Sequence, residues 1–399
     1  MGCSSMRERS APEVLLAFLK LGVTSFGGPI AHLGYFREEI VVRRRWLEDA
    51  AYADLVALCQ FLPGPGSSQV VFSLGLIRAG YWGGLGAWFG FTLPSAVLMT
   101  LFAYGAHTLA GPTGTGLIHG LKLVAVAIVA QAFWGMARTF CPDRQRASIT
   151  GVSALAILFS GSSISQIGAI LVGGVAGSWL CRASTPISAT AFGLPVSRRV
   201  GLISLSAFFL LLLVLPAFGG LSPGIAIFDA FYRSGALVFG GGHVVLPLLS
   251  QAFVTPGWVS EDTFLAGYGA AQAVPGPLFT FAAYLGAVVR QSPNGVVGAV
   301  LGLIGIFLPG ILILLGTLPF WDVFRRRLGA QAIMRGINAA VVGLLGAALY
   351  NPLWTSSVKS SGDFAVVLTL FILLTAWRAP PLLVVVLGAI SGIALVSAG

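Results

Sequence analysis

The chain has 399 residues, of which 56% are hydrophobic and only 9% are charged, with a formal net charge of +10 and a mean hydropathy of +0.91. Soluble domains carry about 25% charged residues, so this composition excludes a soluble fold. The apolar segments lack the period-2 alternation of barrel strands and therefore predict an all-α polytopic membrane protein. The positive charge is typical of loops that face anionic lipid, and we expect no nucleic-acid partner.

A short polar stretch, residues 1–12, opens the chain and has no apolar core, so we expect a cytoplasmic tail rather than a signal peptide. A repeated sequence follows it. FLKLGVTSFGG at Phe18 to Gly28 returns as FYRSGALVFGG at Phe231 to Gly241, and CQFLPGP at Cys59 to Pro65 returns as AQAVPGP at Ala271 to Pro277. A duplicated unit in an apolar chain is typical of secondary transporters, whose substrate site lies between the repeats.

The duplication divides the chain into two repeats and a linker. We expect the first repeat at residues 13–182, the linker at 183–224 and the second repeat at 225–399. Residues 200–218 of the linker are continuously apolar and have no counterpart in the first repeat, which predicts one extra transmembrane helix. A single extra crossing inverts the second repeat relative to the first.

Basic residues in the short loops support this inversion. The first repeat has a basic loop after its FGG motif where the second has none, at Arg37, Arg43, Arg44 and Arg45. The second repeat has a later basic loop where the first has none, at Arg325, Arg326, Arg327 and Arg335. Because basic loops stay cytoplasmic, we expect inverted repeats with about nine to thirteen crossings of the membrane, a cytoplasmic N-terminus and an external C-terminus.

Glycine and proline interrupt two apolar segments in each repeat, which predicts broken or re-entrant helices. Lipid cannot satisfy the exposed backbone of such breaks, so we expect the breaks to face a protein-lined cavity. Their glycines are candidates for substrate binding: Gly27, Gly28, Gly64, Gly66, Gly240, Gly241 and Gly276. Ser67 and Ser68 stand where a new helix would begin, and the free N–H groups of such an end favour an anion. Simple helix kinks are the alternative interpretation.

Charged and amide side chains near the breaks are further candidates. Lys20 and Arg233 occupy equivalent positions in the two repeats, and a symmetric pair of cations fits a divalent oxyanion. Asp229 precedes Arg233 by one helical turn, so an internal ion pair is the alternative for that cation. Gln60 and Gln272 precede the two proline breaks, and we expect them to donate hydrogen bonds to the substrate.

Three residues are candidates for coupling transport to a proton gradient: His32, Asp54 and His243. Packed histidines without such a role are the alternative. The chain has no phosphate-loop motif, no metal-ligand spacing and no nucleophile–base arrangement, so we expect neither an enzyme nor a bound cofactor or metal. Few acids lie within the apolar segments, which favours an anionic substrate over a cation.

Four long motifs carry a family resemblance: FGGPIAHLGYFREEIVVRRRWL, CQFLPGPGSSQ, FGGGHVVLPLL and GYGAAQAVPGPLFTFAAYLG. With them, the chain closely resembles the chromate ion transporter family in its long, two-domain form, over nearly its full length. The resemblance implies an inner-membrane carrier that expels chromate and gives chromate resistance, with sulfate as a structural analogue. The second repeat has Leu278, Phe279 and Thr280 where the first has its serine pair, so the two half-sites differ chemically.

Taken together, these features predict export of chromate by alternating access, driven by the membrane potential, a proton gradient or both. A carrier of sulfate or another oxyanion is an alternative, since dipole ends and arginines recognise charge and tetrahedral shape. An anion channel with re-entrant pore hairpins is another. Besides the substrate, the expected partner is the lipid bilayer, and a homodimer is left open.

Overall fold

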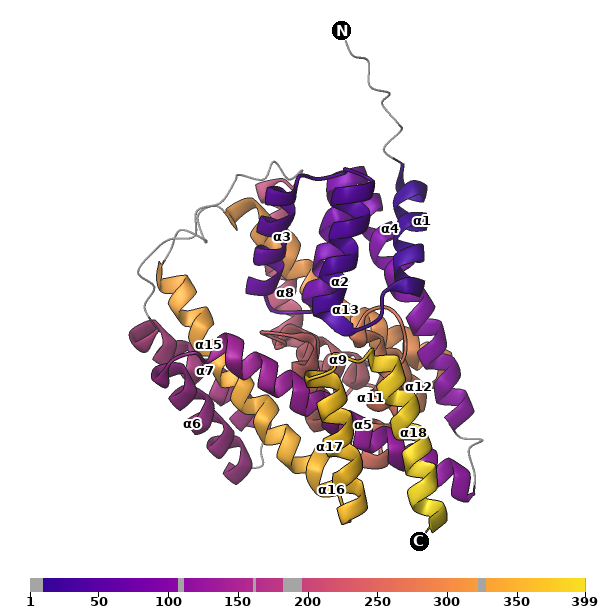
Figure 1. The fold of residues 1–399 in the computed structure, drawn as a ribbon. Helices are drawn as coiled ribbons and strands as arrows, with labels where there is room; N and C mark the ends of the chain where they lie inside the picture. The colour runs from indigo at the N-terminus through magenta and orange to yellow at the C-terminus, as the bar shows by residue number, and fades with distance from the viewer. Residues whose placement is uncertain (1–9, 107–110, 161–162, 182–195, 322–327, 399) are drawn as a thin grey trace.

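The computed structural model describes residues 10–106, 111–160, 163–181, 196–321 and 328–398. Every regular element within these ranges is a helix (Figure 1), which confirms the predicted all-α polytopic membrane fold. Five helices are long and apolar enough to span a membrane: Gly66–Gly105, Thr113–Phe140, Arg198–Phe218, Gly295–Phe320 and Gly329–Ser357. The predicted loop arginines Arg325, Arg326 and Arg327 lie outside the described residues, and the number of crossings stays a prediction.

The first repeat begins with broken helices and ends with longer ones. Its elements are α1 (Ala11–Thr24), α2 (Gly28–Phe36), the π-helical turn η1 (Arg37–Arg43), α3 (Asp49–Phe61), α4 (Gly66–Ala106), α5 (Pro112–Phe140), α6 (Arg144–Ser160) and α7 (Ser163–Leu180). The extra apolar helix of the linker is α8 (Arg198–Phe218). In Figure 1, α1 begins at the upper end of the molecule and α18, the last helix, ends at the lower end.

The second repeat follows the same order with more interruptions. Its elements are α9 (Pro223–Ala236), η2 (Gly242–Val244), α10 (Val245–Leu249), η3 (Ser250–Val254), α11 (Glu261–Ala271), η4 (Leu278–Thr280), α12 (Phe281–Val288), α13 (Gly295–Thr317), η5 (Leu318–Phe320), α15 (Leu328–Ala348), η6 (Leu349–Trp354), α16 (Thr355–Ser357), α17 (Ser361–Thr375) and α18 (Pro381–Ala398). The domain boundaries at residues 182 and 225 stay predictions.

Helix α4 consists of two helical arms joined by a sharp turn, and it folds back on itself there. Its backbone leaves the helical region at Ala79 and Gly80, and a Cβ atom built on Gly75 would lie 2.7 Å from the Cβ of Ala87. Twelve residues of straight helix would span about 18 Å. The turn therefore divides α4 into two antiparallel arms, as α12 and α13 are divided in the second repeat.

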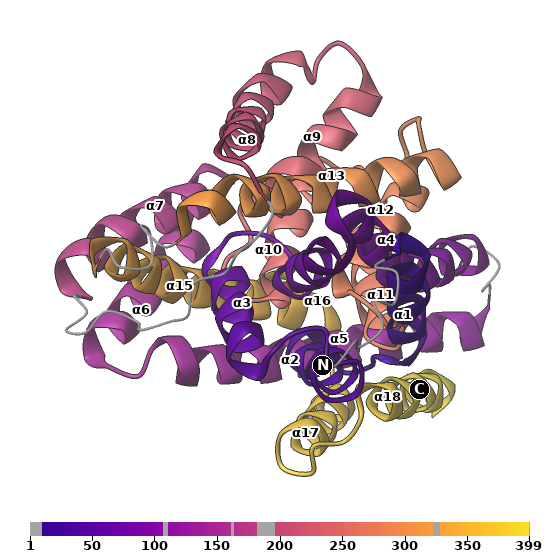
Figure 2. The same cartoon turned by 90° about the horizontal axis from the view of Figure 1, so that it is seen from above.

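The two repeats exchange their last helices. Helix α5 of the first repeat packs against α17 and α18 of the second, whereas α15 of the second packs against α6 and α7 of the first. The exchange rests on equivalent glycines: a Cβ on Gly120 would lie 2.9 Å from Cα of Ala389, and one on Gly336 would lie 2.8 Å from N of Gly177. Close approach through small residues is how helices pack in lipid, where burial of apolar surface gives no net drive. Viewed from above (Figure 2), α6 with α7 and α17 with α18 form separate flanks.

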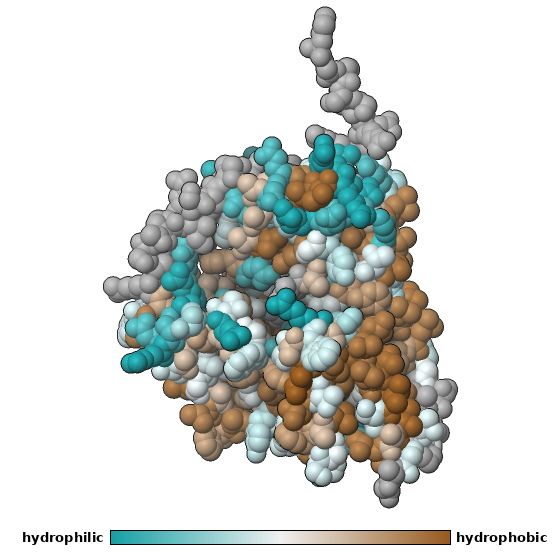
Figure 3. Space-filling model, viewed as in Figure 1, coloured by the Kyte–Doolittle hydropathy of each residue, from teal (hydrophilic) through white to brown (hydrophobic). Residues whose placement is uncertain are grey.

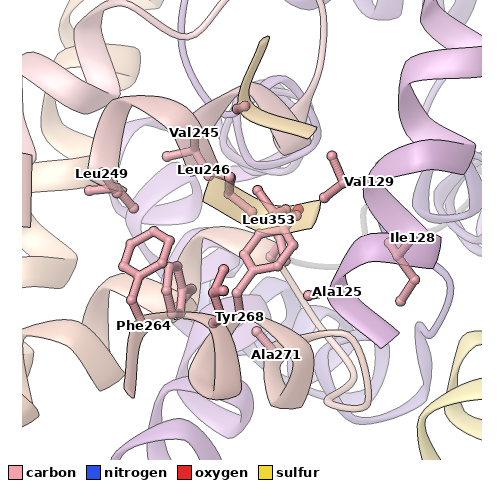
Figure 4. Packing of buried hydrophobic residues seen from close by; sticks show 14 of the residues in the cluster. Ala125, Ile128, Val129, Val245, Leu246, Leu249, Phe264, Tyr268, Ala271 and Leu353 are labelled. Carbon is pink, nitrogen blue, oxygen red and sulfur yellow. The ribbon is translucent and has the colours of Figure 1, made fainter. Parts of the chain in front are cut away.

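A large apolar core lies where α5 meets α10 and α11. Figure 4 shows Ala125, Val129, Val245, Tyr268 and Leu353 among the side chains that fill this region. Hydrophilic residues gather at the upper end of the face in Figure 3, and hydrophobic residues cover its lower right flank. Further hydrophilic residues lie at the centre and left of this face, and the hydrophobic flank is a surface suited to contact with lipid.

Among the described residues, helix α8 packs mainly against α9 and α13 of the second repeat. It packs Phe208 against Tyr232 and Ala236 of α9, close to Leu308 and Leu312 of α13. The equivalent face of the first repeat is an open apolar groove of about 380 Å³ lined by α1, α4 and Pro275. The extra helix therefore makes the surroundings of the two repeats unequal.

Candidate functional site

All four predicted breaks are present. Helix α1 ends before the first FGG motif and α3 ends before the first proline break, and the second repeat is interrupted at the matching places. Each break has at least one glycine with a positive φ that other residues rarely adopt, among them +97° at Gly27, +73° at Gly240, +115° at Gly64 and +100° at Gly276. The glycines therefore allow the backbone conformations at which the helices are interrupted.

Each proline break is hydrogen bonded to the FGG break of the other repeat. The amide of Gly64 donates to the carbonyl of Val238 at 2.7 Å, and the amide of Gly276 donates to the carbonyl of Ser25 at 2.9 Å. Val238 directly precedes the second FGG motif, and Ser25 directly precedes the first. The four breaks thus form two reciprocal pairs that join the repeats through their backbones.

Residues after the mid-helix prolines close the same two junctions. A Cβ on Gly64 would lie 2.8 Å from Cα of Gly310, and one on Gly276 would lie 2.7 Å from Oγ of Ser95. Gly310 follows Pro309 of α13, and Ser95 follows Pro94 of α4. The segments that follow Pro94 and Pro309 therefore form the walls against which the proline breaks pack.

Gln69 is a functional candidate that the sequence analysis missed. Its Nε2 donates to the carbonyl oxygens of Pro63 and Gly310, each at 2.9 Å, so one buried amide joins the first proline break to α13. Its Oε1 is buried and has no hydrogen-bond partner in the described part of the chain. Its position directly after the serine pair, in an otherwise apolar helix, could have identified it from the sequence.

Several polar side chains near the breaks are buried without a partner. Within the described ranges, the unpaired buried atoms include Ser25 Oγ, Ser68 Oγ, Gln69 Oε1 and Thr92 Oγ1. A buried polar group without a hydrogen bond costs about 1–3 kcal/mol. Such a concentration of unused donors and acceptors is what a site for water or a polar ligand requires.

The serine pair stands at a helix start, as predicted. Helix α4 begins at Gly66, and Ser67 and Ser68 lie in its first turn with their side chains buried. The amides of a first turn have no partner within the helix and carry the positive end of its dipole. In the second repeat a single 3-10 turn at Leu278–Thr280 takes this place, so the two half-sites differ in structure as well as in sequence.

The two candidate cations are each paired with a carboxylate. Lys20 Nζ lies 3.4 Å from Glu39 Oε2, and Arg233 Nη2 lies 2.6 Å from Oδ2 of Asp229, which is almost fully buried. The internal pair that was the alternative for Arg233 is therefore present. Both cationic side chains are about half exposed, and no hydrogen bond or ion pair of the described residues joins either to a break. Their role in substrate binding stays a prediction.

The coupling candidates lie in different surroundings. His32 is 1% exposed and packs against the ring of Phe91 with centroids 5.4 Å apart, whereas His243 shares a 2.8 Å hydrogen bond with the hydroxyl of Tyr268. Asp54 lies half-buried on α3. The two histidines thus touch the break region through aromatic contacts, and their coupling role stays a prediction.

The two half-sites are not equally open. A Cβ on Gly240 would lie 3.3 Å from Oδ1 of Asn338 and 3.4 Å from Cε of Met136, so α15 and α5 cover the second FGG break. At the equivalent Gly27 an added Cβ would meet only the Cβ of Ala31 in the adjoining helix, at 3.1 Å, and at Gly28 it would meet no described atom within 4 Å. Gln60, before the proline break that pairs with the second FGG break, is exposed, whereas Gln272, before the other proline break, is half-buried. The first FGG break is open and the second FGG break is covered.

Buried charges away from the breaks were also missed. Lys122 of α5 is nearly buried and donates to Oδ1 of Asp262 at 2.6 Å, and His119 lies 2.6 Å from Asp363. These pairs tie α5 to α11 and α17. No cluster of three or more His, Cys, Asp or Glu residues that could hold a metal ion occurs among the described residues.

Comparison with known proteins places this geometry in a family. The chromate transporter family model matches residues 12–178 and 225–393. The chain is 29% identical to a chromate transport protein of Pseudomonas aeruginosa, over 85% of this chain and 80% of that protein. It is 27% identical to a probable chromate transport protein of Synechococcus elongatus, over 96% and 95% of the two chains. No solved structure matches the chain.

Proposed function

Because the chain belongs to the chromate transporter family, we propose that it exports chromate, a tetrahedral dianion, across the inner membrane and so confers chromate resistance. The observation that carries the proposal is the reciprocal pairing of the four breaks, through Gly64 with Val238 and Gly276 with Ser25. It gathers helix starts, positive-φ glycines and unpaired buried polar atoms at the junction of the repeats. Anions bind at such helix starts because the free amides and the dipole favour negative charge.

In this proposal the dianion enters at the first FGG break, which is the open one, and binds between the repeats. The amides of Gly66, Ser67 and Ser68 are the donors at the start of α4, and Gln60 and Gln272 supply amide groups from the preceding helices. The glycines of the breaks let the backbone approach the ligand closely. Lys20 or Arg233 attracts the dianion, in exchange for its carboxylate partner.

Alternating access follows from the inequality of the half-sites. One break is open and the other is covered, and the two repeats have the same chain order with inverted direction. If the repeats exchange these two arrangements, the open break becomes covered and the covered break opens on the opposite side. We propose that this exchange carries the dianion, with the N-terminus on the cytoplasmic side and the C-terminus outside.

The membrane potential suffices to drive this export. Moving negative charge outward across an inside-negative membrane is favourable by about 2.3 kcal/mol per charge per 100 mV. Proton antiport through His32, Asp54 or His243 is a second source of energy that the proposal does not require. Sulfate shares the charge and shape of chromate, so we expect it to compete.

The experiment is chromate uptake into everted membrane vesicles with an imposed potential and no pH gradient. Potential-driven uptake that excess sulfate inhibits is the expected result. Uptake only with a pH gradient would make proton coupling obligatory, and no uptake under either gradient would contradict chromate as substrate. Saturation of the flux distinguishes a carrier from an anion channel, whose conductance would be much higher.

A further inference from the structure

A basic pocket lies on the surface that carries the start of α1, apart from the breaks. Its volume is about 350 Å³, and four arginines line it: Arg43, Arg44, Arg45 and Arg78. The other lining residues are Glu13, Glu39 and Trp46. The lining therefore carries two more positive than negative charges, which matches the charge of one dianion.

Two of the arginines are held in place on one aromatic ring. The guanidinium carbon of Arg44 lies 5.2 Å from the ring centroid of Trp46, and that of Arg78 lies 5.0 Å from it. Their side chains are only 29% and 19% exposed. Cation–π contact and partial burial fix the two guanidinium groups before any ligand arrives, which lowers the entropy cost of binding.

The two glutamates hold the arginines in place, and the lining of the pocket keeps a net positive charge. Arg78 lies 3.2 Å from Glu13, and Arg44 lies 2.9 Å from Glu39. Burial raises the pKa of the Glu39 carboxyl, but the hydrogen bond from Arg44 and the charges of Lys20 and Arg44 outweigh burial and leave that pKa below its usual value. Glu39 therefore stays ionised and positions the cations, while Arg78 Nε is left as a buried donor without a partner among the described residues.

The pocket exists in one repeat only. The tryptophan has a counterpart in Trp258 and Arg78 in Arg290, but the loop between α10 and α11 has no arginine or lysine. Trp258 instead receives a backbone hydrogen bond at its carbonyl from the amide of Arg290. A binding site built in one repeat lies on one side of the membrane, unlike the breaks, which both repeats share.

We propose that this basic pocket binds a tetrahedral oxyanion dianion on the side of the membrane where α1 begins. Arg44 and Arg78 provide planar guanidinium groups that match two oxygens each, a geometry suited to sulfate-like anions. Lys20 contacts Glu39 at the border of the pocket and belongs to α1, which leads to the first FGG break. The pocket concentrates the anion at the open half-site. Only this last step rests on the proposed function.

The test uses the full-length protein in nanodiscs of phosphatidylcholine, with sulfate as the probe. Sulfate binding is followed by tryptophan fluorescence, and the part of the signal that Trp46→Phe removes reports this pocket. We expect Arg78→Gln and Arg44→Gln each to weaken binding about tenfold or more, since a hydrogen bond to a charged group is lost. Arg78→Lys keeps the positive charge but lacks the planar guanidinium group. Its sulfate affinity should therefore lie between those of Arg78→Gln and the unchanged protein.

The matched control is Arg37→Gln. Arg37 belongs to the same basic loop but pairs with exposed Asp49 outside the pocket, so its removal lowers the net charge equally and should leave sulfate affinity unchanged. Equal weakening by Arg37→Gln and Arg78→Gln would overturn the proposal and indicate general surface charge. Thermal unfolding of each variant separates loss of the site from loss of the fold.

A lipid phosphate is the other source of the same chemistry. Nanodiscs containing phosphatidic acid distinguish the two: if headgroups occupy the pocket, this lipid reduces sulfate binding in the unchanged protein and is retained in an Arg78-dependent manner. Either result supports an oxyanion site. No Arg78-dependent binding of sulfate or phosphatidic acid would overturn it. Because binding is measured without transport, failure of chromate uptake in vesicles would leave this result intact.

Discussion

The amide of Gly64 donates a 2.7 Å hydrogen bond to the carbonyl of Val238, which joins the proline break of one repeat to the FGG break of the other. The matching bond from Gly276 to Ser25 makes the connection reciprocal. Movement of one break away from its partner would therefore break a backbone hydrogen bond between the repeats. This coupling is what alternating access between two repeats requires, because opening of one half-site must accompany closing of the other.

Alanine at Gly64 or Gly276 should abolish transport. Both glycines have a positive φ, which costs other residues about 1–2 kcal/mol, and a Cβ at Gly64 would lie 2.8 Å from Cα of Gly310. The added strain should displace the hydrogen-bonded amide and separate the paired breaks. Chromate uptake into vesicles and thermal unfolding in detergent measure the two effects.

The control for this prediction is Gly34→Ala in α2. Gly34 is helical and its Cβ would meet nothing within 4 Å, so alanine should preserve uptake and stabilise the helix by roughly 0.5–1 kcal/mol. Full transport by Gly64→Ala would show that the positive-φ glycine and its junction are dispensable.

The sequence predicted where the helices break but not which breaks meet. The glycine and proline motifs at Gly64 and Gly276 indicate an interruption of the helix, because the backbone preferences of these residues act within a single chain segment. Val238 and Ser25 contribute only backbone carbonyls, which every residue has, so no side-chain pattern announces the pairing. The sequence also did not predict that α5 and α15 pack against helices of the other repeat. A glycine indicates close approach of another helix but does not identify that helix.

Alanine at Gly120 and at Gly336 should destabilise the protein to a similar extent. Each glycine lies at one of the two exchanged helix contacts, with the new Cβ 2.9 Å from Cα of Ala389 or 2.8 Å from N of Gly177. Overpacking of this kind costs about 1–3 kcal/mol. Gly135→Ala on α5 is the control, because its Cβ meets nothing within 4 Å. Thermal unfolding in detergent is the measurement, and a strong effect at only one of the two sites would contradict the twofold relation.

Removal of the candidate cations separates substrate binding from internal pairing. Lys20→Ala leaves Glu39 with Arg43 and Arg44, so we expect the fold to survive and chromate uptake to fall. Arg233→Gln leaves buried Asp229 without its partner, which destabilises the protein by itself.

The double variant Asp229→Asn with Arg233→Gln removes both charges and should restore thermal stability without restoring uptake. Uptake that returns with stability would assign Arg233 to the internal pair alone. Unchanged uptake after Lys20→Ala and Arg233→Gln together would exclude both side chains from the substrate path.

Cysteine accessibility tests the inequality of the two half-sites. In a variant whose four native cysteines are replaced, Gln60→Cys should react quickly with a membrane-impermeant anionic thiol reagent, because Gln60 is exposed before the first proline break. Gln272→Cys should react slowly, since its position before the second proline break is half-buried. If the repeats exchange arrangements, conditions that favour the opposite state should slow the first reaction and speed the second, from the other side of the membrane. Equal rates at both positions, or reaction of both from one side, would mean that the breaks do not alternate.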